Sequence, residues 1–195
     1  MPLDATETVI QSTGDVYFAP VGTAFPTLFT APATPWESVG HITTDGPRPS
    51  GFDADSEKFY SWQSPRTAIR SAPGQTEPTF SADLMQVNPN TLSLYFGPGT
   101  LTADVWTPTP GAVAPESALV IDIFDGDDQY RWCIKRVQPS AAGEINLTSS
   151  ELATFPVRFD MLAAPDNSAP FEFRMPPNTS TLNAALQADT ETAAA

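Results

Sequence analysis

Residues 76–97 read TEPTFSADLMQVNPNTLSLYFG and decide the fold, because a strand pattern here runs directly into a capped helix. Phe80, Ala82 and Leu84 alternate with polar residues, which is the period of two expected of a strand that buries one face. The segment therefore predicts a half-buried strand whose other face meets solvent or a partner.

A short helix follows this strand. Asn88 occupies the N-cap position and Pro89 the first helical position, where its fixed φ suits a helix and its missing N–H is not needed. Gly97 ends the helix after about two turns, which is too short for a helix to be stable alone in water. We therefore predict that the helix packs on a sheet. The residues expected at this contact are Leu92, Tyr95 and Phe96.

Composition predicts a mainly β chain. The 195 residues are 41% hydrophobic, which is enough for one domain with a core. The 21 prolines and 11 glycines interrupt any long helical pattern. Further strands are predicted from alternating patterns at residues 14–20, 36–43, 101–106, 119–124, 130–135, 155–161 and 171–175. The runs 119–124 and 130–135 flank an Asp-Gly-Asp-Asp turn and predict a hairpin.

The fold class that we predict is an antiparallel β-sandwich or barrel with one short flanking helix and long loops or arms. Residues 1–13 are expected to form an N-terminal arm, residues 14–175 the β domain, and residues 176–195 a C-terminal tail. Residues 46–75 form a long connection within the domain, and a connection of that length is usually functional.

The chain is strongly acidic. It has 23 acidic residues against 9 Lys and Arg, which gives a net charge of −14. Such a surface repels phosphate backbones and argues against nucleic-acid binding by charge neutralisation. No run approaches the roughly 20 apolar residues of a membrane span, and no signal-peptide pattern is present. Neither membrane insertion nor secretion by the general route is predicted.

The sequence lacks the familiar motifs of catalysis, cofactor binding and metal binding. One histidine and one cysteine cannot make an ordinary zinc site, and no phosphate-binding loop, dinucleotide fingerprint or serine-hydrolase elbow occurs. His41 and Cys133 lie in predicted strands and are interpreted as structural side chains. We predict no cofactor, no metal and no enzymatic activity.

Two acidic groups have alternative interpretations. Asp53, Asp55 and Glu57 have the spacing of the first ligands of a calcium loop, but Lys58 and Ser64 replace the required Gly and Glu. A second group at the hairpin end is either a solvated turn or a patch of negative potential that faces an anion. It consists of Asp122, Asp125, Asp127 and Asp128. A pair of glycosidase carboxylates stays an alternative, although nothing distinguishes an acid from a base.

Four passages resemble a known family. They are TGDVYFAPVGT at 13–23, WESVGHITTDGP at 36–47, TFSADLMQVNPNTLSLYFG at 79–97 and ELATFPVRFDML at 151–162. Together they resemble the major tail protein, or tail-tube protein, of long-tailed bacteriophages, most of all the non-contractile kind that infects actinobacteria. The strand that leads into N-P-N-T-L is the most distinctive of the four. The loop at 21–35 and the tail after Pro176 depart from the family pattern.

The resemblance implies a structural virion protein, synthesised in the host cytoplasm and located in the tail. It implies hexameric rings that stack into a hollow tube, through which genomic DNA passes without specific binding. The partners implied are other copies of the chain and the tape-measure, tail-terminator and tail-tip proteins, with no membrane. It also implies that residues 46–75 reach the neighbouring ring.

The long connection and the lumen carry the residue-level expectations. Residues 46–75 have few apolar side chains, so we expect the segment to become ordered only on contact with a neighbouring subunit. The side chains expected at that contact are Phe52, Phe59, Tyr60 and Trp62. Asp83 and Asp122 are expected to line the lumen, where negative potential would let DNA slide.

Other function classes stay open on sequence alone. A capsid decoration protein or a carbohydrate-binding β-sandwich would show the same strand and loop pattern. Exposed aromatic platforms at Trp62 or Trp106 would favour sugar binding. A hydrolase is the less favoured alternative because its motifs are missing.

Overall fold

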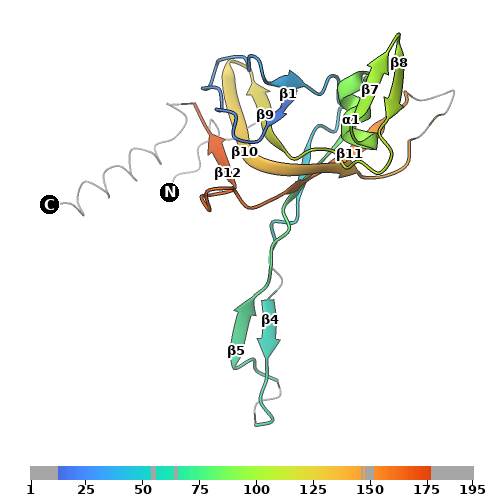
Figure 1. The fold of residues 1–195 in the computed structure, drawn as a ribbon. Helices are drawn as coiled ribbons and strands as arrows, with labels where there is room; N and C mark the ends of the chain where they lie inside the picture. The colour runs from blue at the N-terminus through green and yellow to red at the C-terminus, as the bar shows by residue number, and fades with distance from the viewer. Residues whose placement is uncertain (1–12, 54–55, 64–65, 146, 148–151, 177–195) are drawn as a thin grey trace.

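The computed structural model describes residues 13–53, 56–63, 66–145, 147 and 152–176 (Figure 1). The predicted N-terminal arm and C-terminal tail therefore lie almost entirely outside the described residues. The strands are β1 Thr13–Pro20, β2 Glu37–Ser38, β3 Arg48–Ser50, β4 Ser56–Phe59, β5 Arg70–Pro73, β6 Thr79–Leu84, β7 Gly99–Thr102, β8 Val105–Pro108, β9 Ser117–Asp125, β10 Asp128–Ala141, β11 Phe155–Met161 and β12 Phe171–Arg174. The described helix is α1, Pro89–Phe96.

The body of the protein is one antiparallel sheet of eight strands. Seven of them follow the order β2-β1-β9-β10-β11-β6-β3, and β12 pairs with β10. The path ends at β2 on one side and at β3 on the other, so the described strands do not close into a barrel. The predicted mainly β, antiparallel fold with one short helix is confirmed, without a closed barrel.

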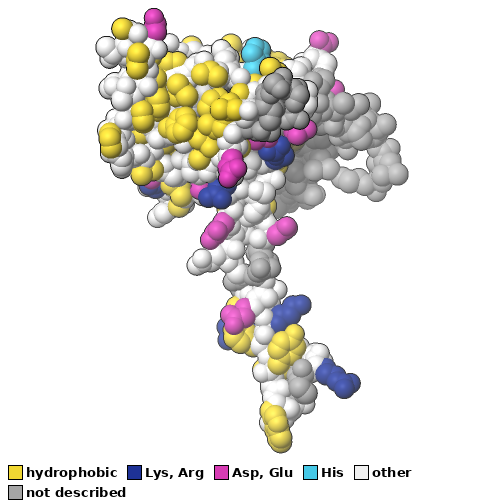
Figure 2. Space-filling view, turned by 90° about the vertical axis from the view of Figure 1, so that its right-hand side faces the viewer, with side chains coloured by type: hydrophobic (Ala, Val, Ile, Leu, Met, Phe, Trp, Pro, Cys, Tyr) yellow, Lys and Arg dark blue, Asp and Glu magenta, His cyan; other side chains and the backbone are white. Residues whose placement is uncertain are grey.

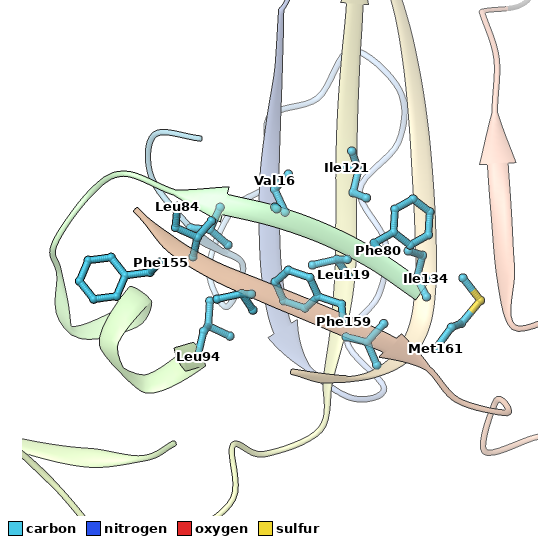
Figure 3. Packing of buried hydrophobic residues seen from close by; sticks show 14 residues of the cluster. Val16, Phe80, Leu84, Leu94, Leu119, Ile121, Ile134, Phe155, Phe159 and Met161 are labelled. Atoms are coloured by element: carbon cyan, nitrogen blue, oxygen red, sulfur yellow. The ribbon is translucent and has the colours of Figure 1, made fainter. Parts of the chain in front are cut away.

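Strand β10 folds the sheet over on itself. One edge of this 14-residue strand pairs with β9, with a register shift between Ile134 and Val137. The other edge pairs first with β12 and, from Val137 onward, with β11. A bulge bends a strand and increases its twist. Strands β6 and β11 therefore cross the face of β1 and β9, as Figure 3 shows.

The main core lies between these two halves of the sheet. It contains Val16 and Ile121 from one half and Leu84, Phe155 and Phe159 from the other, all of them buried (Figure 3). The predicted alternation of β6 is confirmed, since Phe80, Ala82 and Leu84 are its buried residues. Burial of apolar area at this interface is the main stabilising term of the fold.

Helix α1 packs on the core through two of the three predicted residues, Leu92 and Tyr95, and through two residues that were not predicted, Thr91 and Leu94. The Asn88 side chain accepts a hydrogen bond of 2.8 Å from the Thr91 amide, which confirms the predicted cap. Thr91 and Leu94, one turn apart, are the buried helix residues. Leu92 and Tyr95 are half-buried against the core. Phe96 is 47% exposed, so its predicted burial is wrong.

Two predicted strands differ in the structure. In 36–43 only Glu37–Ser38 forms a strand, because Gly40 adopts a φ of +87° and interrupts the run. In 101–106 the chain forms the hairpin β7–β8 in place of one strand. Its two turn residues, Ala103 and Asp104, have φ of 48° and 65°, as a tight hairpin turn requires.

The second face of β1 and β9 is covered by residues 21–36. Trp36 is buried there with Ala19, Ala118 and Val120, and Phe25 packs against them. Because both faces are covered, the first six residues of β9 are all buried, which a simple alternating pattern does not predict.

A buried arginine holds this covering loop in place. Arg131 donates from Nε and Nη2 to the two carboxylate oxygens of Asp122, at 2.5 and 2.7 Å. Its remaining donors reach three loop carbonyls, those of Pro26 at 3.1 Å, Thr27 at 2.7 Å and Thr30 at 3.1 Å. A guanidinium has five N–H donors, and here each has an acceptor. The side chain of Arg131 is fully buried.

Removing one partner of this pair should be strongly destabilising. Asp122→Ala leaves the Arg131 charge buried without its counter-ion, and the expected loss in free energy of unfolding is about 3–5 kcal/mol. The matched control is Asp160→Ala, which breaks the more exposed Arg158–Asp160 pair on β11. Its expected loss is below about 1 kcal/mol. Urea unfolding of the unassembled subunit measures both, and equal losses would contradict this account.

Candidate assembly surfaces

A hairpin projects far from the body of the protein (Figure 1). Strands β4 and β5 pair with each other and with no other described strand. We call residues 52–76 the arm and residues 58–70 the arm tip. Residues 48–50, which were predicted to belong to the long connection, form β3 and pair with β6 of the body. The prediction that 46–75 orders only on contact with a neighbour is wrong for β3, β4 and β5, which form within one chain.

The base of the arm is fixed to the body by one aromatic side chain. The Phe52 ring lies 6.2 Å from Phe80, 6.3 Å from Trp132 and 6.0 Å from Phe171, centroid to centroid. Two of these contacts are edge-to-face, the geometry that aromatic pairs prefer. Phe52 is therefore an anchor of the arm within its own subunit.

Gly51 precedes this anchor and lets two backbone segments approach closely. Its φ is +73°, and a Cβ atom at this position would lie 2.0 Å from the Glu77 carbonyl oxygen. Only glycine fits such a crossing without a backbone shift. Together with the β3–β6 pairing, this contact sets the direction in which the arm leaves the body.

The arm tip exposes large apolar side chains. Trp62 is 93% exposed and Tyr60 53%, and Phe59 and Ile69 are also exposed. The register places Phe59 opposite Arg70 at the last pair of the hairpin. Each such side chain would gain on the order of 1.5–3 kcal/mol if fully buried. Three of the four side chains predicted to contact a neighbour, Phe59, Tyr60 and Trp62, are thus free for such a contact in the single chain.

A second apolar surface covers the side of the body that carries α1, β7 and β8. Figure 2 shows hydrophobic side chains gathered on this side. The Phe96 ring lies 5.9 Å from Trp106 of β8. Leu101 of β7 is the cross-strand partner of Trp106, so the two side chains lie on the same face of the hairpin, and both Phe96 and Leu101 are exposed. We call Phe96, Leu101 and Trp106 the apolar face, and an exposed apolar group of this kind indicates a contact with another protein.

The two aspartates predicted to line a lumen have different environments. Asp122 is 2% exposed and is paired with Arg131, so the prediction that it faces a channel is wrong. The sequence could have predicted this ion pair, because a two-residue turn at 126–127 places Asp122 opposite Arg131 in the hairpin. Asp83 is only partly buried, and Arg48 lies 2.8 Å from its carboxylate. That Asp83 lines a lumen stays a prediction, and in the single chain its charge is balanced by Arg48.

Among the described residues, His41 and Cys133 do not belong to a group able to hold a metal. No group of three or more His, Cys, Asp or Glu residues able to hold a metal occurs in the part of the chain that the structure describes. A polar hollow of about 290 Å³ includes His41, Asp15 and Asp45, and His41 is exposed there. Cys133 is buried, and burial raises the pKa of its thiol to about 11, which keeps it protonated and unreactive at neutral pH. The described helix is not long and apolar enough to cross a membrane.

Comparison with known proteins bears on this geometry. A family described as "Phage tail tube protein" matches residues 1–184 of the chain. The major tail protein Gp23 of Mycobacterium phage D29 is 32% identical over 171 residues, which covers 76% of this chain and 81% of that protein. The region that matches the family, residues 1–184, contains the whole arm and the whole sheet.

The buried thiol gives stability a pH dependence in the alkaline range. Cys133 has its pKa raised from 9.0 to about 11 in the folded state, because burial disfavours the thiolate. Between these values the unfolded state loses a proton that the folded state keeps. The free energy of unfolding therefore falls as pH rises, by up to about 1.4 kcal/mol per pH unit.

Cys133→Ala isolates this effect, because the raised pKa of Tyr17 contributes equally to both proteins. Urea unfolding between pH 8 and pH 11 should show a shallower decline for the variant. Parallel declines would mean that the thiol is not shielded from water.

The close approach at Gly51 predicts a position-specific effect. Gly51→Ala and Gly111→Ala introduce the same side chain at φ of +73° and +72°, but nothing lies within 4 Å of the added Cβ at Gly111. Left-handed strain alone costs about 1–2 kcal/mol. Thermal unfolding should therefore show a clearly larger loss for Gly51→Ala than for Gly111→Ala. Equal losses would show that the base of the arm yields freely.

Proposed function

Because this chain belongs to the phage tail tube protein family and is a structural protein of the virion tail, we propose that six copies close into a ring and that rings stack into a tube. The tube conducts genomic DNA from the virion into the host. The partners in this proposal are further copies of the chain, with tape-measure, tail-terminator and tail-tip proteins along and at the ends of the tube.

The observation that carries the stacking proposal is the projecting arm. It is fixed at its base by Phe52 and ends in the exposed aromatic residues Tyr60 and Trp62. A contact between two different surfaces of identical copies gives a closed ring where the rotation between copies closes, and an open filament where it does not. An arm that reaches the next ring is such a contact, and it supports growth along one axis.

The apolar face supports lateral contacts within a ring. It lies on the body, where Phe96 of α1 and Leu101 of β7 are exposed. We assign its occupant as a second copy of this chain in the same ring, because the family is a self-assembling one. The ends of the sheet at β2 and β3 offer further backbone donors and acceptors for pairing between copies.

The acidic charge supports passage of DNA. With a net charge of −14, the tube wall would repel phosphates and would not hold the DNA by counter-ion release. We propose that Asp83 faces the lumen. Asp122 does not, because it is buried.

Membership in the family makes the alternative functions less favoured. Membership in a structural tail family supports the prediction that the chain is not an enzyme. It favours a tail role over capsid decoration and over carbohydrate binding. Exposed Trp62 lies at the end of a hairpin, where it fits a protein contact as well as a sugar platform.

Electron microscopy of the purified full chain tests the proposal. The wild-type protein should form rings and tubes. In the test variant, residues 54–75 are replaced by Gly-Gly, which removes the hairpin β4–β5 but keeps β3 and the Phe52 anchor. This variant should form rings without long tubes.

The matched control is Thr67→Ala, which changes an exposed arm residue with no apolar or charged role. It should assemble as the wild type does. Long tubes from the variant without the hairpin would contradict the proposed stacking role of the arm.

A further inference from the structure

In the described part of the chain, the basic residues of the body form ion pairs, whereas those of the arm tip do not. Six of the nine lie on the body, and each has a carboxylate oxygen within 4.0 Å. The other three, Lys58, Arg66 and Arg70, are in the arm tip and form no ion pair with a described acidic residue. The unmatched positive charges of the described chain are therefore confined to the arm tip.

The arm tip is also free of acidic residues. From residue 58 to residue 76 the sequence contains no Asp or Glu. The net charge of −14 is therefore the resultant of +3 on this segment and −17 on the rest of the chain. Lys58, Arg66 and Arg70 are all exposed. Figure 2 shows basic side chains gathered on the projecting hairpin.

These cations are interleaved with exposed apolar side chains. Phe59 and Arg70 are cross-strand partners, so their side chains lie on the same face of the hairpin. Trp62 and Ile69 extend the apolar part of the same segment. Aromatic residues and arginine are the residues most enriched at protein–protein contacts. The arm tip is thus built for a partner that is acidic and offers apolar contact.

We infer that the arm tip binds the acidic body of a second copy of this chain, and that its three cations, in addition to its aromatic residues, control this binding. The inference rests on the proposed stacking role of the arm. The charge complementarity is internal to the sequence, since the body that receives the arm carries the opposite net charge. Tube growth is therefore steered by electrostatic attraction and is weakened by salt.

The test uses the full chain in nuclease-treated, DNA-free preparations. The triple variant Lys58→Gln, Arg66→Gln, Arg70→Gln removes the charges and keeps the aromatic residues. The matched control, Lys135→Gln, Arg136→Gln, Arg158→Gln, changes the net charge equally but on the body. The critical concentration for tube formation is measured by sedimentation and electron microscopy, from about 50 mM to about 0.5 M NaCl.

At low salt the arm variant should need about tenfold more protein than the wild type to form tubes, since three exposed ion pairs per contact are lost. The difference should vanish at high salt. The body variant should follow the wild type.

Three results would overturn the inference. One is that the triple Gln variant of the arm tip assembles like the wild type and with the same salt dependence, while the variant that lacks the hairpin fails to stack. That result would leave the proposed function intact. A second is duplex DNA binding by the wild type that the arm variant loses, which would make nucleic acid the partner. The third is absence of wild-type tubes at every salt concentration, which would remove the proposed function as well.

Discussion

The buried Arg131 is the constraint on which the two-sided burial of the sheet depends. Its five donors are distributed between Asp122 on the neighbouring strand and three carbonyls of the 21–36 loop. Arg174 adds a 2.8 Å hydrogen bond to the Pro26 carbonyl, so β9, β10, β12 and the loop are tied at one point. If the loop left, three donors of Arg131 would lose their acceptors and Trp36 would be uncovered, so its departure would cost stability.

Local patterns predicted those parts of the fold that depend on local chemistry. The strand and capped helix at 79–96 and the hairpin strands at 119–124 and 130–135 follow from alternation, an N-cap and a tight turn, whereas the extension of β10 to Ala141 was not predicted. The β7–β8 hairpin was missed because its turn residues, Ala103 and Asp104, are not glycines. The buried face of α1 depends on where β10 and β11 lie, so Leu94 could not be preferred to Phe96 from helix periodicity alone.

The candidate surfaces also combine features that the local sequence predicts with features that depend on tertiary packing. The sequence indicated a long functional connection and its aromatic residues, but it could not show that Phe52, although 40% exposed, packs on Phe80 of its own subunit while Trp62 is 93% exposed. The total charge of the sequence could not show which cations lack a partner. Six of the nine Lys and Arg residues form ion pairs only once folding brings acidic residues beside them. Asp122 could have been assigned correctly by pairing it with Arg131 through the hairpin turn.

Cryo-electron microscopy of tubes assembled from the full chain at low salt tests the central claim most directly. The claim is that an acidic subunit joins its successor through a basic aromatic arm tip. The account predicts that residues 58–70 of one copy lie on an acidic surface of a copy in the next ring, with Trp62 buried. A reconstruction with the arm folded against its own subunit, or with Trp62 in solvent between stacked rings, would contradict it.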